Sequence, residues 1–254
     1  MPSLRNVTTQ KEMTTMIVHG GYGNYGMALG ILMLDSKFAR IPGDVGNATT
    51  YDYPVVFKII DGAGGDRVLN GDPSLLEPFI QGAKELEAAG CKAITTSCGF
   101  LAAFQKEIAA AVNVPVFTSS LMQVDLVSKM LKPDQVVGII TAHSGSLGEK
   151  HFAGAGIEHV PKVVIGLEDT FFLDAFNSPD GTYDTDDLQR EMVAHAKKLV
   201  SEHPEIGALV FECTNMPPFA AAVQEATGLP VFDYTTLANY VYSALIRRPF
   251  HGFM

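Results

Sequence analysis

The chain has 254 residues, of which 47% are hydrophobic and 18% are charged, a composition typical of folded globular proteins. Its formal net charge is −10 and its 18 Lys and Arg residues form no basic run, which argues against nucleic acid and anionic membranes as partners. No apolar stretch approaches the roughly 18 residues of a membrane span, the N-terminus lacks an apolar signal core, and three cysteines are too few for a disulfide framework. We therefore expect a cytoplasmic protein.

Residues 1–26 are expected to form an N-terminal extension. Within them, GYGNYG at 21–26 formally matches the dinucleotide fingerprint G-x-G-x-x-G. The residues that follow, MALGILML, favour a strand over the helix that this fingerprint requires. We therefore expect a lead-in to the first strand here, and no nucleotide site.

Short apolar runs rich in β-branched residues predict strands, and the longer runs between them predict helices. The predicted strands cover 30–34, 55–60, 92–96, 135–142, 160–166 and 208–213. Helices are predicted from Asp72, as N-cap, to Gly90, and over 188–202. Repeated βα units indicate a mostly parallel sheet covered by helices, in which ligands bind at the carboxyl ends of the strands.

Several polar residues follow predicted strands. Asp35 comes directly after the first strand and is expected to contact substrate. The hydroxyls of Ser119, Ser120 and Thr141 follow later strands, where they either cap helices or bind a substrate carboxylate. The polar segment 40–54 is either a plain turn region or a substrate lid. The seven His residues show no metal-ligand spacing, so we expect no metal.

Two segments of the chain resemble each other. Residues 93–117 (AITTSCGFLAAFQKEIAAAVNVPVF) and 208–232 (ALVFECTNMPPFAAAVQEATGLPVF) align without a gap at an offset of 115, which is 208 − 93. Shared Ala, Val and Pro are expected between any two βα units. The alignment also places Cys98 on Cys213, and recurrence of a rare residue at one topological position favours a duplication.

The duplication predicts an α/β fold of two pseudo-symmetric, Rossmann-like lobes with mostly parallel sheets and an active site in the cleft between them. Lobe one is predicted to comprise 27–120 with 235–254 and to carry Cys98. Lobe two is predicted to comprise 121–234 and to carry Cys213.

A pair of thiols in one cleft suits proton transfer at a carbon next to a carboxylate, because two acid–base groups can serve its opposite faces. Both Cys98 and Cys213 precede predicted helical stretches, whose free N–H groups should lower the thiol pKa. The amides near Gly99 and Thr214 could also hold a substrate carboxylate or a developing enolate. Cys91 has no duplicate and is assigned to core packing.

The motifs TTSCGFLAAFQ (95–105) and FECTNMPPFA (211–220) resemble those of the aspartate/glutamate/hydantoin racemase superfamily, and the similarity extends over 30–242. The resemblance implies a cofactor-independent enzyme, assembled as a homo-oligomer, in which Cys98 and Cys213 are the acid–base residues. Racemases of amino dicarboxylates usually have Asn and Thr after the first cysteine and Glu after the Cys-Thr of the second. Here Gly99 and Phe100 follow Cys98, and Asn215 follows Thr214.

The residues that follow the two cysteines are expected to contact substrate: Gly99, Phe100, Thr214 and Asn215. The Cys-Gly-Phe form, with GLPVFD at 228–233, is also similar to algal dimethylsulfoniopropionate lyases of this superfamily. Those enzymes remove an α-proton and expel a sulfide.

Three functions follow from these residues. The first is a racemase or epimerase that moves the α-proton of a small carboxylate-bearing substrate, of amino acid or hydantoin type, without a metal, nicotinamide or pyridoxal phosphate. The second is a lyase on the same scaffold that performs β-elimination. The third, least favoured by the paired cysteines, is a non-catalytic binding protein for a small ligand.

Overall fold

The computed structural model describes residues 18–177 and 181–253. Most of the predicted extension 1–26 lies outside these ranges, and residues 18–26 are exposed and belong to no helix or strand. The strand β1 (Leu29–Leu34) follows them, as the sequence predicted in place of a nucleotide-binding helix. In the described ranges, no helix is long and apolar enough to cross a membrane.

The first lobe contains a parallel four-stranded sheet in the order β2-β1-β3-β4. The remaining strands of this sheet are β2 (Val55–Ile60), β3 (Ala93–Thr96) and β4 (Val116–Phe117). Its helical segments are η1 (Ala48–Thr50), α1 (Gly65–Leu69), η2 (Pro73–Leu75), α2 (Leu76–Ala88), η3 (Gly99–Phe104) and α3 (Gln105–Ala110), followed by η4 (Ser120–Gln123) and α4 (Val124–Ser128).

The second lobe repeats this plan in the order β6-β5-β7-β8, again all parallel. Its strands are β5 (Val136–Thr141), β6 (Lys162–Gly166), β7 (Ile206–Phe211) and β8 (Val231–Phe232). Its helical segments are η5 (Ser144–Ser146), α5 (Glu149–Ala155), α6 (Phe171–Asn177), α7 (Thr185–Glu202), η6 (Pro217–Phe219) and α8 (Ala220–Thr227). The last helix of the chain is α9 (Tyr234–Leu245).

The strand register supports the duplication residue by residue. Ile94 pairs with Val116 in the first sheet, and Leu209 pairs with Val231 in the second, so both partners are displaced by 115. The two sheets also share one strand order. The predicted fold of two pseudo-symmetric α/β lobes with parallel sheets is therefore confirmed.

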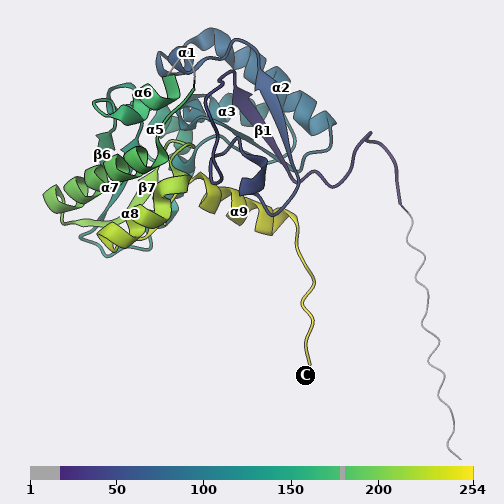
Figure 1. Cartoon of the computed structure of the whole chain (residues 1–254). Coiled ribbons are helices and arrows are strands. Elements are labelled where there is room, and N and C mark those ends of the chain that lie inside the picture. Colours follow the sequence, from purple (N-terminus) through teal and green to yellow (C-terminus); the bar gives the residue numbers. More distant parts are fainter. Residues whose placement is uncertain (1–17, 178–180, 254) are drawn as a thin grey trace, which may run out of the picture.

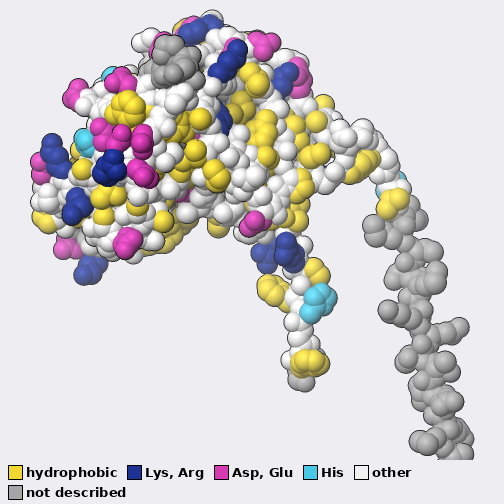
Figure 2. All heavy atoms as spheres, viewed as in Figure 1, with side chains coloured by type: hydrophobic (Ala, Val, Ile, Leu, Met, Phe, Trp, Pro, Cys, Tyr) yellow, Lys and Arg dark blue, Asp and Glu magenta, His cyan; other side chains and the backbone are white. Residues whose placement is uncertain are grey.

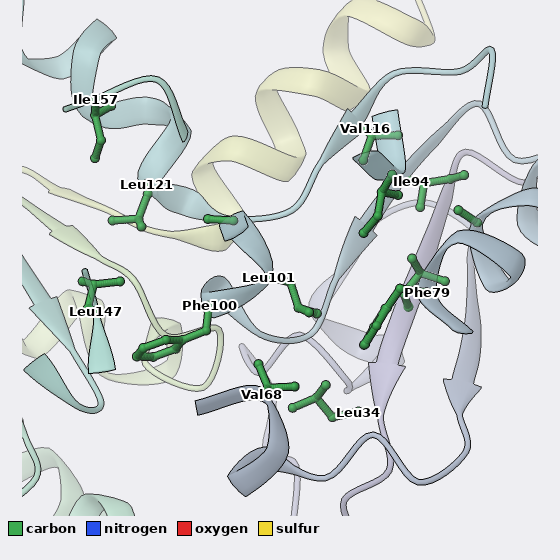
Figure 3. Close-up of a cluster of buried hydrophobic side chains, with 14 of the residues drawn as sticks. Leu34, Val68, Phe79, Ile94, Phe100, Leu101, Val116, Leu121, Leu147 and Ile157 are labelled. Carbon is green, nitrogen blue, oxygen red and sulfur yellow. The ribbon is translucent and has the colours of Figure 1, made fainter. Parts of the chain in front are cut away.

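A continuous hydrophobic cluster joins the lobes. It includes Phe79 and Ile94 in the first lobe, Leu101 in η3, and Leu147 and Ile157 in the second lobe. Figure 3 shows these side chains in one region, with those of η3 and η4 between the elements of the two lobes. Because packed interiors resist deformation, this cluster fixes the position of one lobe against the other.

The C-terminal helix returns to the first sheet. In α9, Tyr234, Leu237 and Ala238 are buried against a cluster that contains Leu29 and Ile31 of β1. Beyond α9 the chain runs away from the body of the molecule (Figure 1), and its hydrophobic and arginine side chains stand free of the main surface (Figure 2). The lobe boundaries 27–120 with 235–254 and 121–234, and the homo-oligomer, stay predictions.

Most predicted elements lie within two residues of those observed, and the helical stretches after the two cysteines differ most. Cys98 is followed by the 3₁₀ segment η3 before α3 begins. Cys213 is followed by a turn, and η6 begins only at Pro217. Neither cysteine therefore directly precedes an α-helix.

Two buried hydrogen bonds cross between the lobes next to the cluster. The Ser120 hydroxyl donates to the carbonyl oxygen of Phe211, and the Thr214 hydroxyl donates to the carbonyl oxygen of Ser97 at 2.7 Å. Since Ser97 and Phe211 adjoin the two cysteine segments, these bonds hold both strand ends together.

Replacing Ser120 by Ala should lower the free energy of unfolding by about 1–3 kcal/mol, because a buried carbonyl group loses its partner. Ser243→Ala is the matched control, since Ser243 is exposed on α9 and bonds only within that helix. We expect that control to change stability by no more than about 0.5 kcal/mol. Urea unfolding followed by circular dichroism makes the comparison, and equal losses in both variants would contradict a stabilising bond between the lobes.

Candidate active site

A cavity of about 110 Å³ lies between the lobes, at the carboxyl ends of β1, β3, β5 and β7. At the volume that one enclosed water requires, this is space for roughly seven to eleven water-sized groups. The cavity therefore suits a small substrate. Both lobes contribute its polar and charged side chains, which are Ser36, Arg40, Ser97, Cys98, Glu212, Cys213 and Asn215.

The two predicted thiols line this one cavity. Cys98 is the second residue after β3, and Cys213 is the second residue after β7, so they occupy equivalent positions in the two lobes. Each is partly exposed. Cys91 is instead buried in the hydrophobic cluster, as predicted. The fold thus brings together the two cysteines that the duplication pairs.

The electrostatic state of the thiols differs from the prediction. Burial raises the pKa of Cys98 to about 12, and the negative charge of Glu212 adds to this shift. Burial also raises the pKa of Cys213 well above its ordinary value, again with Glu212 as the second cause. The N–H groups of Phe100 and Asn215 do favour the thiolates, but their effect is smaller. The expectation that helix N-termini lower the thiol pKa is therefore wrong.

A buried carboxyl group lies beside the thiols. Glu212 is fully buried, and burial raises its pKa to about 7. Its Oε2 accepts a hydrogen bond from the Thr141 hydroxyl at 2.8 Å, which opposes the shift. Within the described ranges, its Oε1 has no hydrogen-bond partner. Of the three cavity-wall groups with a raised pKa, Cys98, Glu212 and Cys213, only Glu212 therefore has a pKa near neutrality.

Gly99 makes room for this carboxyl group. A Cβ atom at Gly99 would overlap both Oε1 and the carbonyl oxygen of Glu212. The backbone directly after Cys98 can therefore approach Glu212 only because residue 99 has no side chain.

A chain of polar contacts links Cys213 to a cation. The Cys213 thiol donates to Oδ1 of Asn215 at 3.4 Å, and Nδ2 of Asn215 donates to Asp44 at 2.7 Å. Arg40 pairs with the other oxygen of Asp44 at 2.7 Å, and also donates to the Ser36 hydroxyl at 2.9 Å. The segment 40–54 thus supplies a partly buried ion pair next to the cavity.

Aromatic rings form another part of the wall. Phe38 and Phe172 each contact Phe176 edge to face, with ring centroids 4.7 Å apart in both pairs. The Arg40 guanidinium lies 4.3 Å from the centroid of Phe38. All three rings line the cavity, as does Phe100. The wall therefore combines one cation with several π faces.

Of the residues predicted to contact substrate, Gly99, Phe100 and Asn215 line the cavity. The other five do not, because their side chains are engaged elsewhere or exposed. Thr141 donates to Glu212 and Thr214 to Ser97, as described above.

The three residues that remain do not line the cavity, although Asp35 lies between Leu34 and Ser36, which do. Ser119 caps η4 by accepting from the N–H of Leu121, and Ser120 donates to the carbonyl oxygen of Phe211. Asp35 is exposed and accepts from the N–H of Gly62 at 3.3 Å. The two serines thus make capping and interlobe contacts, and the alternative that they bind a carboxylate stays a prediction.

Sequence reasoning missed Glu212, Arg40 and the aromatic wall. One feature of the sequence does point to Glu212, because it is the only charged residue in the strand-like run ALVFEC. A carboxylate in such a run is costly to bury and marks a functional site. Arg40 and Phe38 left none, because they lie in a loop whose course the sequence does not fix.

In residues 18–177 and 181–253, no group of three or more His, Cys, Asp and Glu side chains could hold a metal ion. The use of a cofactor stays a matter of prediction.

Residues 66–239 match the sequence model of the family described as Asp/Glu/hydantoin racemase. A dimethylsulfoniopropionate lyase of Durusdinium sp. clade D is 31% identical over 233 residues, which cover 89% of this chain and 77% of that protein. Dimethylsulfoniopropionate lyase 7 of Emiliania huxleyi is 30% identical over 236 residues, which cover 89% of this chain and 69% of that protein.

Two solved structures share the fold at low sequence identity. Unliganded arylmalonate decarboxylase superimposes with a TM-score of 0.56 at 16% identity, covering 86% of this chain and 92% of that one. A glutamate racemase of Bacillus anthracis gives a TM-score of 0.55 at 11% identity, covering 87% and 85%. These likenesses concern the two-lobed architecture.

Replacing Gly99 by Ala should lower the free energy of unfolding by about 1–3 kcal/mol, because the added carbon must displace Glu212 or the backbone after Cys98. Gly64→Ala is the control, since nothing lies within 4 Å of a Cβ there. It should change stability by no more than about 0.5 kcal/mol. Thermal unfolding compares the two, and a fully stable Gly99→Ala protein would contradict the close approach of Glu212.

Proposed function

The chain belongs to the Asp/Glu/hydantoin racemase family, and we propose that its reaction is the elimination of dimethyl sulfide from dimethylsulfoniopropionate. In this reaction a thiolate of the cavity removes the proton from the carbon next to the carboxylate. The electrons of that C–H bond form the C=C bond of acrylate, and the C–S electron pair leaves with sulfur. One proton is released for each substrate consumed.

The observation that carries this proposal is the composition of the cavity wall. Two thiols share the wall with Arg40 and the aromatic rings of Phe38, Phe172 and Phe176. A sulfonium group has no N–H donor, so aromatic faces suit it better than hydrogen-bond acceptors do. The carboxylate of dimethylsulfoniopropionate needs one cation, and Arg40 can supply it.

The charge of the wall favours this substrate over an amino dicarboxylate. Among the described residues that line the cavity, Arg40 is the one cationic side chain, and Asp44 already pairs with it. Aspartate or glutamate would bring two carboxylates, whereas the sulfonium substrate has no net charge. The similarity to dimethylsulfoniopropionate lyases over 89% of the chain supports the same choice.

Racemisation or epimerisation of a small carboxylate-bearing substrate is the second candidate. It is favoured by one observation, the equivalent positions of Cys98 and Cys213 in two pseudo-symmetric lobes. To move a proton from one face of a carbon to the other, an enzyme needs an acid–base group on each face, and two thiols on one cavity can supply them.

Substituting the two thiols separately distinguishes these reactions. For elimination, one of Cys98→Ser and Cys213→Ser should lose about 10²–10⁴-fold or more of kcat, while the other keeps a measurable part, because elimination needs one base. Dimethyl sulfide release measured by gas chromatography gives kcat. Cys91→Ala is the control outside the cavity and should retain activity.

Racemisation would instead be abolished by either substitution. In deuterium oxide it would place deuterium at the α-carbon of recovered, stereochemically scrambled substrate. That result with amino acids or hydantoins, together with no release of dimethyl sulfide, would overturn the elimination proposal.

The contribution of the aromatic wall to binding can be tested with two ligands that differ in charge but hardly in shape. Phe38→Leu should weaken binding of dimethylsulfoniopropionate by about 2- to 30-fold, the range of a lost cation–π contact. Isocaproate, in which a CH group replaces the sulfonium sulfur, has nearly the same shape and no cation. Its inhibition constant should change little. Equal weakening of both ligands would show that Phe38 only packs against them.

A further inference from the structure

The carboxyl group of Glu212 has no part in the reaction as written so far, although it lies on the cavity wall. It is fully buried, and its Oε1 has no partner within the described residues. That oxygen lies against Gly99, beside Cys98, while Glu212 directly precedes Cys213 in the chain. An unpaired carboxylate is costly to bury, so its retention on a cavity wall that also holds two thiols points to a chemical use.

The thiols need such a group. A thiolate in this cavity has to form next to a carboxylate, and two like charges in a buried space oppose each other. Glu212 is in fact a cause of the raised pKa of both thiols. Arg40 relieves this only in part, because it is the smallest of the causes acting on the Cys98 pKa and its partner Asp44 raises the pKa of Cys213. The cavity therefore favours a single negative charge, shared among Cys98, Cys213 and Glu212.

We propose that Glu212 accepts the proton that the reacting thiol loses, so that the thiolate base forms without a change in the charge of the cavity. The inference rests on the proposed use of a thiol as base. The S–H proton moves to the carboxylate, which gives a thiolate and a neutral carboxylic acid. The thiolate then takes the α-proton of the substrate and becomes a thiol again.

Glu212 also accounts for the proton that the overall reaction releases. After elimination both the thiol and the carboxyl group are protonated, and acrylate and dimethyl sulfide leave. Glu212 then gives its proton to solvent, and this is the one proton that the overall reaction releases. Glu212 acts through the thiol and makes no bond to the substrate.

The pH dependence follows from the ionisation of this group. Glu212 can accept a proton only when it is ionised, so activity should rise with pH through its pKa, which burial raises to about 7. The titratable groups that interact with it are Cys98 and Cys213, and the Arg40–Asp44 pair acts on these thiols in turn. The Thr141 hydroxyl opposes the shift by donating to the carboxylate.

The test measures thiol reactivity separately from turnover. In the wild-type protein, the rate at which iodoacetamide alkylates the cavity cysteines should rise through about pH 7. Glu212→Gln keeps the volume but cannot take a proton. In this variant the rise should move above pH 7, to the thiols' own pKa, which is lower than in the wild-type protein because the charge of Glu212 no longer raises it. The value of kcat near neutrality should fall about 10²–10⁴-fold. Glu212→Asp should restore part of the activity and keep the rise near neutrality.

Two further variants separate this role from a structural one. Thr141→Val removes the bond that lowers the Glu212 pKa, so the alkylation curve should move upward in pH. Glu191→Gln removes another carboxyl group with an unpartnered oxygen, which does not line the cavity, and should leave the curve unchanged.

An alkylation curve in Glu212→Gln that still rises near pH 7 would overturn the inference, whatever the substrate. Absence of dimethyl sulfide release from a wild-type protein with the expected alkylation curve would instead remove the proposed function and leave the role of Glu212 in place.

Discussion

The carboxyl group of Glu212 is buried at the junction of the two lobes, one residue before one cysteine and against the glycine that follows the other. Burial raises the pKa of both thiols, and the charge of this carboxylate, which little water screens, raises it further, so both thiols stay protonated near neutrality. In the proposed mechanism, a thiol becomes a base by giving its proton to this carboxylate. The chemistry of the cavity is thus governed by the position of one proton.

The fold explains how this arrangement is maintained. Two sheets of the same strand order place the ends of β3 and β7 at one cavity, and a hydrophobic cluster shared by both lobes fixes their separation. Buried hydrogen bonds from Ser120 and Thr214 then tie the segments on either side of the cysteines. Phe38 and Arg40 come from the loop after β1, and Phe172 and Phe176 come from α6. In the proposed function, these residues select the substrate.

The sequence predicted the elements whose pattern is repeated or periodic. The apolar runs located the main strands, and the 115-residue offset paired Cys98 with Cys213, because a duplicated unit preserves its register. It could not predict Arg40 or Phe38 as parts of the wall, since loop courses depend on tertiary packing. It also misjudged the thiols, because spacing shows a helix start but not the desolvation that outweighs it.

The most direct test of this account is an infrared titration of the Glu212 carboxyl group, obtained as the difference between the wild-type protein and Glu212→Gln. The account predicts a protonated carboxyl band that persists below about pH 7 and is lost as the pH rises through that value. A band already lost near pH 4.3, the ordinary range of a glutamate, would contradict it. In that case the carboxylate would be charged throughout and could not exchange a proton with the thiols near neutrality.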